Sequence, residues 1–172
     1  MQGIPLTSGN TLYLSPRLEP LTGFVLEKLR KQGITEVVPL MEYDELLMYY
    51  GFDPLPVYQK NNITVTHFPI QDFDVPGDME AFAGLIEHIA ESLKRHSVLV
   101  HCLGGIGRTG TVASAFLVRI GYTPEKAIDL VRKIRPGSIQ NRFQEKFVFD
   151  YERYLRNKGI SEIEELNATN IP

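Results

Sequence analysis

The stretch that decides the fold of this chain is His101-Cys102-Leu103-Gly104-Gly105-Ile106-Gly107-Arg108-Thr109-Gly110. It follows Val98-Leu99-Val100, a short and continuous apolar run of the kind found in the middle of a sheet. A helix is predicted to follow it, from about Thr109 to Ile120. The segment is therefore a glycine-rich turn between a central strand and a helix, a position where backbone N–H groups bind anions.

This turn holds the three components that chemistry at a phosphoryl group needs. Cys102 would be the nucleophile, because a thiol beside cations at a helix N-terminus can have a pKa of roughly 3.5–7.5 instead of about 8.5. The backbone N–H groups would cradle the oxygens, since the glycines let the chain turn tightly. Arg108 would supply a planar cation that binds two oxygens at once. The predicted substrate-binding residues are Leu103, Gly104, Gly105, Ile106, Gly107 and Arg108.

Two neighbours of the nucleophile are expected to support it. Thr109 can donate its hydroxyl to the Cys102 sulfur and help it leave in a second step. His101 is expected to hold the loop by hydrogen-bonding the backbone, without acting as an acid. The alternative is an inert buried cysteine before a glycine-rich turn. Chance odds of about 10⁻⁵ per cysteine for this pattern favour the catalytic interpretation.

The segment, written HCxxGxxRT, resembles the signature loop of the protein tyrosine phosphatase superfamily. It is most similar to the small atypical dual-specificity phosphatases, including compact archaeal-type members. The similarity covers roughly Ile63 to Arg156. The resemblance implies an α/β fold with a mixed, mainly parallel central sheet flanked by helices. It also implies a phosphocysteine intermediate and no metal or other cofactor.

A poor leaving group needs a proton, so a carboxylic acid is expected near the bound phosphate. The loop from Phe68 to Pro76 is the best source. In the family, a Pro-Ile-x-Asp-x-x-x-Pro stretch carries the acid at its first aspartate, which matches Asp72. Asp74 is the second candidate, and Asp78 is more simply a helix cap. The alternative for both loop aspartates is a solvated turn.

A second segment, Arg135-Pro136-Gly137-Ser138-Ile139-Gln140, also resembles the family. In the family this loop carries a polar residue that orients the hydrolytic water. Gln140 fits that role and Gln144 is a second possibility, whereas the alternative is a glutamine that faces solvent. Aromatic residues that recur at helical spacing nearby are predicted to pack in the core. They are Phe143, Phe147, Tyr151 and Tyr154.

Helix and strand signals alternate along the rest of the chain, which favours a layered α/β domain. The expected strands outside the central one are residues 11–14, 36–40 and 61–68. The expected helices are 22–31, 42–50, one capped by Asp78, one opened by Thr123-Pro124, and 140–158. Residues 69–77, with two prolines and two aspartates, are expected to form a loop.

The 172 residues indicate a single catalytic domain, and the acidic tail from about residue 159 is expected to be frayed. A net charge of −3 gives no basic field, so neither a nucleic acid nor a membrane partner is expected. One cysteine cannot form an internal disulfide. Residues 1–10 lack a signal-peptide pattern, and a cytoplasmic monomer acting on phosphorylated proteins or peptides is the default.

The sequence thus predicts a cysteine-dependent phosphatase for phosphotyrosine, with phosphoserine and phosphothreonine as further substrates. Four alternatives stay open. They are a rhodanese-type sulfurtransferase, a phospho-binding module without activity, a phosphatase of phosphoinositides or other non-protein phosphates, and an RNA 5′-phosphatase. The cation Arg108 and the Asp72 loop favour phosphate ester cleavage over sulfur transfer. The depth of the pocket decides between phosphotyrosine alone and dual specificity.

Overall fold

The computed structural model describes residues 1–162 and 166–169 of the chain. Five strands form one sheet in the order β1-β2-β5-β3-β4. Their bounds are β1 Gln2–Pro5, β2 Thr11–Ser15, β3 Ile34–Pro39, β4 Thr64–Val65 and β5 Ser97–His101. The helices are α1 Gly23–Lys31, α2 Tyr43–Tyr50, α3 Leu55–Lys60, α4 Met79–Leu93, α5 Gly107–Arg119, α6 Pro124–Ile134 and α7 Arg142–Lys158.

The sheet is mixed and mainly parallel, as predicted. β5 lies at its centre, parallel to β2 on one side and to β3 on the other, and only β1 runs antiparallel. His101, the last residue of β5, stands level with Ser15 of β2 and with Pro39 of β3. The loop after β5 therefore leaves the sheet between the carboxyl ends of two neighbouring strands, where ligands bind in open α/β sheets.

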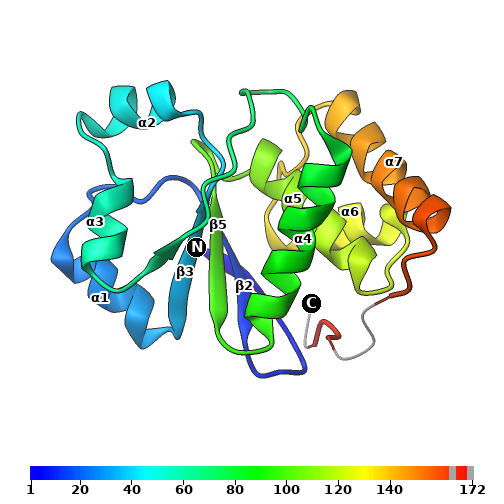
Figure 1. Ribbon diagram of the computed structural model, residues 1–172, viewed down its shortest axis with the longest axis horizontal. Coiled ribbons are helices and arrows are strands. Elements are labelled where there is room, and N and C mark those ends of the chain that lie inside the picture. Colours follow the sequence, from blue (N-terminus) through cyan, green and yellow to red (C-terminus); the bar gives the residue numbers. More distant parts are fainter. Residues whose placement is uncertain (163–165, 170–172) are drawn as a thin grey trace.

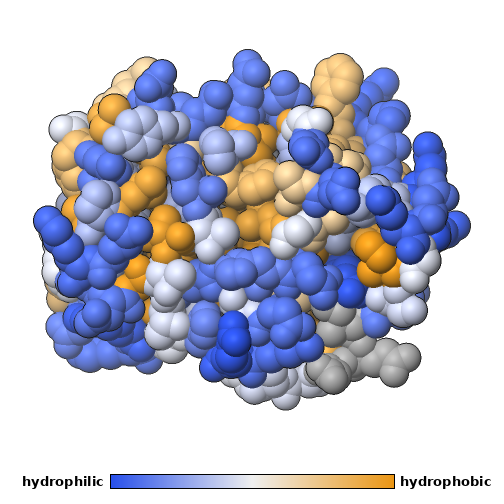
Figure 2. Space-filling view, viewed as in Figure 1, coloured by the Kyte–Doolittle hydropathy of each residue, from blue (hydrophilic) through white to orange (hydrophobic). Residues whose placement is uncertain are grey.

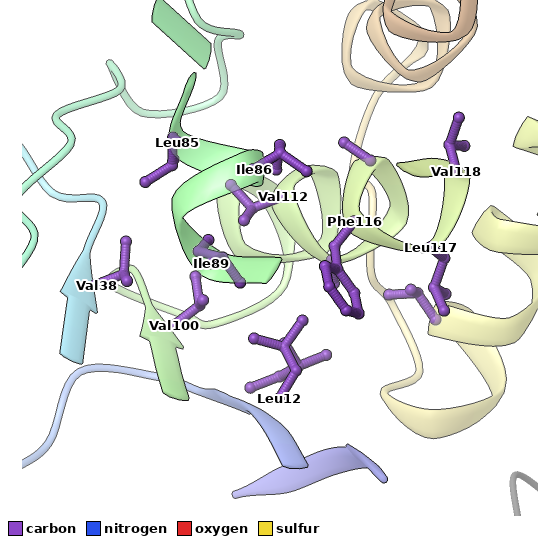
Figure 3. Close-up of a cluster of buried hydrophobic side chains, with 14 of the residues drawn as sticks. Leu12, Val38, Leu85, Ile86, Ile89, Val100, Val112, Phe116, Leu117 and Val118 are labelled. Atoms are coloured by element: carbon purple, nitrogen blue, oxygen red, sulfur yellow. The ribbon is translucent and has the colours of Figure 1, made fainter. Parts of the chain in front are cut away.

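Helices cover both faces of this sheet. α1 and α3 lie on one side of the strands, whereas α4, α5, α6 and α7 lie on the other (Figure 1). The smaller core, under α1 and α3, includes Leu26, Leu29, Val37, Tyr58 and Leu99. The larger core lies on the opposite face, and Figure 3 shows part of it between β3, β5, α4 and α5. Adjacent strand residues such as Leu99 and Val100 thus face different cores, because successive side chains alternate across a sheet.

α5 is buried along its whole length, from Gly107 to Arg119. All five residues of β5 are buried as well, which explains why this strand is a continuous apolar run rather than an alternating one. In Figure 3, Val112 of α5 lies beside Ile86 of α4, and the ring of Phe116 points toward Leu12 of β2. The strand and the helix that flank the glycine-rich turn are therefore the two most enclosed elements, and they hold the turn rigidly.

Local signals in the sequence explain where the helices begin and end. Thr22 and Thr123 cap α1 and α6 by accepting backbone N–H groups. Asp78 caps α4 by accepting from the N–H groups of Glu80 and Ala81, at 2.9 and 3.0 Å. Gly51 ends α2 in the left-handed conformation with φ 73°. These four boundaries are confirmed, and they lie where side-chain caps and glycine satisfy the free backbone groups.

Several elements differ from the predictions in their bounds, and two elements were not predicted. β4 covers only Thr64–Val65 of the strand predicted over 61–68, although hydrogen bonds to β3 continue from Thr66 and Phe68. α5 begins at Gly107, two residues before the predicted Thr109. The edge strand β1 and the helix α3 were not predicted.

Phe143 was predicted to pack in the core, and this is wrong, because its side chain is 74% exposed. It belongs to the first turn of α7, which extends beyond the sheet, whereas Phe147 and Tyr151 further along are buried. The tail is not frayed where it is described: Leu166 is buried, and the Thr169 N–H donates to the Pro5 carbonyl at 2.8 Å. Residues 163–165 and 170–172 of the acidic tail lie outside the described residues.

Candidate active site

The glycine-rich turn links β5 to the first turn of α5. Gly105 has φ 70°, a conformation that glycine adopts without strain. A Cβ atom at this position would lie 2.3 Å from backbone atoms of Ser15 and Pro16, so the turn passes directly against the end of β2. Only glycine fits here. The sequence thus folds the turn into a tight loop whose end is the N-terminus of α5.

Cys102 lies at the base of this loop and is 3% exposed. Its sulfur accepts the backbone N–H of Gly105 at 3.1 Å. The thiol also interacts electrostatically with two guanidinium groups, Arg108 and Arg135. The Cys102 sulfur thus lies beside a backbone N–H donor and two cations, at the turn that leads into the N-terminus of α5.

Arg108 is held in place by a carboxylate that the sequence analysis did not identify. Its guanidinium is 1% exposed and donates twice to Glu45 of α2, Nη1 to Oε2 at 2.6 Å and Nη2 to Oε1 at 3.1 Å. Nη1 also donates to the carbonyl of Ile70 at 2.9 Å. Burial acts to lower the pKa of Arg108, but the hydrogen bonds to Glu45 and the charge of Cys102 outweigh it, and the pKa is raised.

The loop between β4 and α4 brings one of its aspartates to this cation. Asp72 Oδ1 lies 2.9 Å from Nη2 of Arg108, and the Asp72 side chain is 43% exposed. Both loop aspartates also accept the N–H of the next residue, Asp72 from Phe73 at 3.1 Å and Asp74 from Val75 at 2.8 Å. Asp78 caps α4, as predicted. Of the three aspartates, Asp72 is the one that forms an ion pair with Arg108 in the part of the chain that the structure describes.

Both candidate glutamines lie against the loop. The side-chain oxygen of Gln140 lies 2.2 Å from where a Cβ atom on Gly107 would stand, which explains why this helix begins with glycine. Gln144 is fully buried and accepts the N–H of Gln140 at 2.9 Å. Gln140 therefore faces the glycine-rich turn from an exposed position, and the buried Gln144 holds its backbone N–H.

Thr109 and His101 differ from their predicted contacts. The Thr109 hydroxyl is buried and has no hydrogen-bond partner among the described residues, so the predicted donation to Cys102 is not formed. His101 is fully buried, and neither ring nitrogen makes a well-formed hydrogen bond within that part of the chain. Burial lowers the pKa of His101 to about 4, with a smaller opposing effect of the Cys102 backbone. His101 is thus a neutral ring packed beneath the loop.

Arg135 is a second residue that the sequence analysis did not assign. Its Nη2 donates to the Gly104 carbonyl at 2.9 Å, and its Nε donates to the Gly105 carbonyl. Burial lowers the pKa of Arg135, and the charge of Cys102 opposes that effect. Because the guanidinium binds carbonyls of the loop, the N–H groups of the same peptides are directed toward the other side. Such an arrangement of consecutive N–H groups forms an anion-binding nest.

Apolar side chains surround the mouth of this site. Met48 and Tyr43 of α2 are 72% and 46% exposed, and Phe73, next to Asp72, is 61% exposed. An open depression on the α2 side contains Glu45, the partner of Arg108. Its lining combines Tyr43, Met48 and Pro69 with the acidic residues Glu42, Asp44 and Glu45. In Figure 2, apolar side chains protrude at the top of the view, above α2 and at the start of α7.

The described residues contain no cluster of three His, Cys, Asp or Glu side chains that could hold a metal ion. The same part of the chain has no helix long and apolar enough to cross a membrane.

Comparison with known proteins places these features in context. A family model described as polymorphic toxin system, DSP-PTPase phosphatase, matches residues 19–122. Cyclin-dependent kinase inhibitor 3 from Homo sapiens is 33% identical over 133 residues, which are 75% of this chain and 62% of that protein. The chain therefore spans less than two thirds of the length of that relative.

Two solved structures share the fold. The active form of Tk-PTP superimposes with a TM-score of 0.69 at 29% identity, covering 83% of this chain and 90% of that one. Kinase associated phosphatase, KAP, superimposes with a TM-score of 0.74 at 24% identity, covering 90% of this chain and 94% of the other.

Proposed function

Because the chain belongs to the DSP-PTPase family of phosphatases, we propose that it hydrolyses phosphotyrosine in proteins or peptides, with phosphoserine and phosphothreonine as further substrates. The observation that carries this proposal is the convergence of Cys102, Arg108 and Asp72 at the carboxyl end of the central strand. The Gly105 N–H lies 3.1 Å from the sulfur, and Asp72 lies 2.9 Å from the guanidinium.

In the first step, the Cys102 thiolate attacks the phosphorus atom and the bond to the leaving oxygen breaks. The loop N–H groups and Arg108 stabilise the charge on the three equatorial oxygens. Asp72, protonated, gives its proton to the leaving oxygen, which departs as an alcohol or phenol. The products of this step are the free hydroxyl compound and phosphocysteine at Cys102.

In the second step, water attacks the phosphorus of phosphocysteine. Gln140 orients the water, Asp72 takes its proton, and the sulfur leaves as a thiolate. The hydroxyl of Thr109 has no partner to give up among the described residues, so it can turn to donate to that sulfur. Inorganic phosphate and the starting enzyme are the products, and neither step calls for a metal ion.

The contact between Asp72 and Arg108 links the binding of substrate to the position of the proposed general acid. Nη2 of Arg108 carries two N–H groups: one faces Asp72 Oδ1 at 2.9 Å and the other donates to Glu45 at 3.1 Å. Nε has no partner among the described residues, so a phosphate bound through Nε and Nη2 would take the place of Asp72, while Glu45 keeps its bonds to the guanidinium. Substrate binding would thus release Asp72 to face the leaving oxygen.

The surroundings of the site support a protein substrate. The loop positions between Cys102 and Arg108 carry no charged side chain, so they offer no cation for a polyphosphorylated inositol. Met48, Tyr43 and Phe73 around the mouth are apolar and exposed, as suits contact with the residues that flank a phosphorylated side chain. A thiolate nucleophile also has to stay reduced, which suits the proposed cytoplasmic location.

A substrate panel tests the proposal. We expect release of phosphate from phosphotyrosine peptides, slower release from phosphoserine and phosphothreonine peptides, and little from phosphoinositides or RNA 5′ ends. The variant Cys102→Ser, measured on every substrate, corrects for contaminating phosphatases. A preference for phosphoinositides of tenfold or more in kcat/KM would overturn the protein substrate while leaving the phosphatase chemistry intact.

A further inference from the structure

The loop that carries Asp72 is attached to the site through three of its backbone carbonyls. Arg108 Nη1 donates to Ile70 at 2.9 Å, and Asn141 Nδ2 donates to Phe73 at 2.7 Å. Gln144 Nε2 donates to Asp74 at 3.4 Å, a long and weaker contact. Asn141 therefore makes the shortest of the three bonds, and it binds the residue directly after Asp72.

Phe73 needs such an external contact. Its φ is 59°, in the left-handed region that a bulky residue rarely adopts. A strained residue of this kind persists only where the surrounding structure fixes it. The Phe73 side chain is 61% exposed, so packing against the core does not hold it. Within the loop, the Phe73 N–H donates to Asp72 Oδ1 and the Asp74 N–H donates to the Gln71 carbonyl, both at 3.1 Å. The hydrogen bond from Asn141 is the contact that ties the Phe73 peptide to a different element, α7.

The side-chain amide of Asn141 makes two different hydrogen bonds, one through its oxygen and one through its nitrogen. Its Oδ1 accepts the N–H of Gln144 at 2.9 Å and so caps the beginning of α7. Its Nδ2 remains for the Phe73 carbonyl. The two ends of one side chain thus connect a rigid helix, whose buried residues include Gln144, to an exposed loop.

We propose that Asn141 is a positioning residue of this reaction, which holds the acid loop in the closed arrangement that brings Asp72 to the leaving oxygen. The inference rests on the proposed role of Asp72 and extends it. Because Asn141 acts through the loop, its loss should affect proton delivery and leave attack by Cys102 unaffected. A role in capping α7 alone would produce no such distinction.

Asn141 has two roles that two variants can separate: the hydrogen bond to the Phe73 carbonyl, which we call the latch, and the cap on α7. In Asn141→Ser the hydroxyl still caps the helix, but the shorter side chain has no amide to reach Phe73. In Asn141→Ala both contacts are lost. We expect both variants to lower kcat for phenyl phosphate by about three- to tenfold, the worth of one net hydrogen bond. The loss should be smaller for 4-nitrophenyl phosphate, whose leaving group departs without a proton. Asn141→Ala should lower the melting temperature more than Asn141→Ser does, because it also loses the cap on α7.

A double-mutant cycle with Asp72→Ala gives the decisive comparison. When Asp72 is absent, Asn141→Ser should cause no further loss on phenyl phosphate. If Asp72→Ala shows the leaving-group-dependent loss and Asn141→Ser does not, the latch is refuted and the acid stands. The latch is also refuted if Asn141→Ser lowers kcat equally on phenyl phosphate and 4-nitrophenyl phosphate. It is refuted as well if Asn141→Ser lowers kcat in the Asp72→Ala background as much as in the wild-type protein. If Asp72→Ala itself lacks that dependence, the assigned acid and the latch both fail.

Discussion

Replacing Glu45 tests how the buried cation of the site is held. Both oxygens of Glu45 accept from Arg108, and Oε2 also accepts the N–H of Glu42 at 2.9 Å. In Glu45→Gln one oxygen becomes an NH₂ group, so a donor faces a donor of Arg108 at either position, and at the Oε2 position it faces the Glu42 N–H as well. The variant keeps the size of the side chain, and any effect therefore comes from charge and hydrogen bonding.

The magnitude follows from the burial of the pair. Removing one partner of a buried ion pair typically costs about 3–5 kcal/mol. The Glu45 side chain is partly exposed, and Arg108 keeps the Ile70 carbonyl and Asp72 as partners, so we expect a cost below that range for Glu45→Gln, about 2–3 kcal/mol. Urea unfolding at pH 7 measures this difference in the free energy of unfolding. The control is Asp44→Asn on the same helix, an exposed position where we expect a change within about 0.5 kcal/mol.

The effect should also depend on pH with a defined sign. Burial acts to raise the pKa of Glu45, but hydrogen bonds from Arg108 and the Glu42 backbone outweigh it, and the pKa is lowered. A carboxyl with a lowered pKa in the folded state stabilises the protein above its unfolded pKa of about 4.3, and that contribution is lost as the pH falls through the folded pKa. The gap between wild type and Glu45→Gln should therefore narrow below about pH 4. Equal stability of Glu45→Gln and Asp44→Asn at pH 7 would refute this account of the pair.

Three further predictions concern the acid, the loop and the thiol. Asp72→Ala should lower kcat on a tyrosyl phosphate by roughly 10²–10⁴-fold, with a smaller loss on an activated aryl phosphate. Asp74→Ala should cost much less, and the reverse result would move the acid to Asp74. Gly105→Ala should abolish turnover and lower the melting temperature, because its Cβ would meet Ser15 and Pro16 backbone at 2.3 Å; an active variant would show that the loop is not fixed there. Graded peroxide should oxidise Cys102 to a sulfenic acid or a cyclic sulfenamide, since no second cysteine can form a disulfide. The intact mass of the protein measures this oxidation. Unchanged mass and activity would argue against an activated thiol.

The sequence predicted the parts of the site that adjacent residues build. The turn from β5 to α5 combines a buried strand, glycines and a helix N-terminus within ten residues, so its conformation follows from local rules. The caps at Thr22, Asp78 and Thr123 are local in the same sense. Asp72 was placed through the resemblance of its loop to the family.

The residues that were missed act across long distances in the chain. Glu45 is 63 residues from Arg108, and Arg135 is 30 residues from Gly105. Glu45 looks like an ordinary residue of a helix first turn, and no pattern in the sequence distinguishes it from Asp44. His88 is similar: it lies outside every motif, yet its ring lies 2.6 Å from the buried carboxylate of Glu36. Such pairs become visible only once the topology brings their elements together.

The contacts of Thr109 and His101 show a different limit. Their residue types suggested hydrogen bonds to the sulfur and to the backbone, but the orientation of a buried side chain depends on the packing around it. His101 is enclosed beside Tyr58, with ring centroids 6.5 Å apart, so its position is set by the smaller core under α3. The prediction that Phe143 packs in the core was wrong for another reason: the helical spacing of apolar residues does not show where along the helix the core ends.

The most direct test of the central claim is to trap the phosphoryl group on the enzyme. The protein is mixed with 4-nitrophenyl phosphate, quenched in acid within one turnover, digested and analysed by mass spectrometry. The account predicts one added phosphoryl group on the peptide that contains Cys102, and neither label nor turnover in Cys102→Ser. Steady turnover by Cys102→Ser, or a phosphoryl group on any other residue of the wild-type protein, would contradict it.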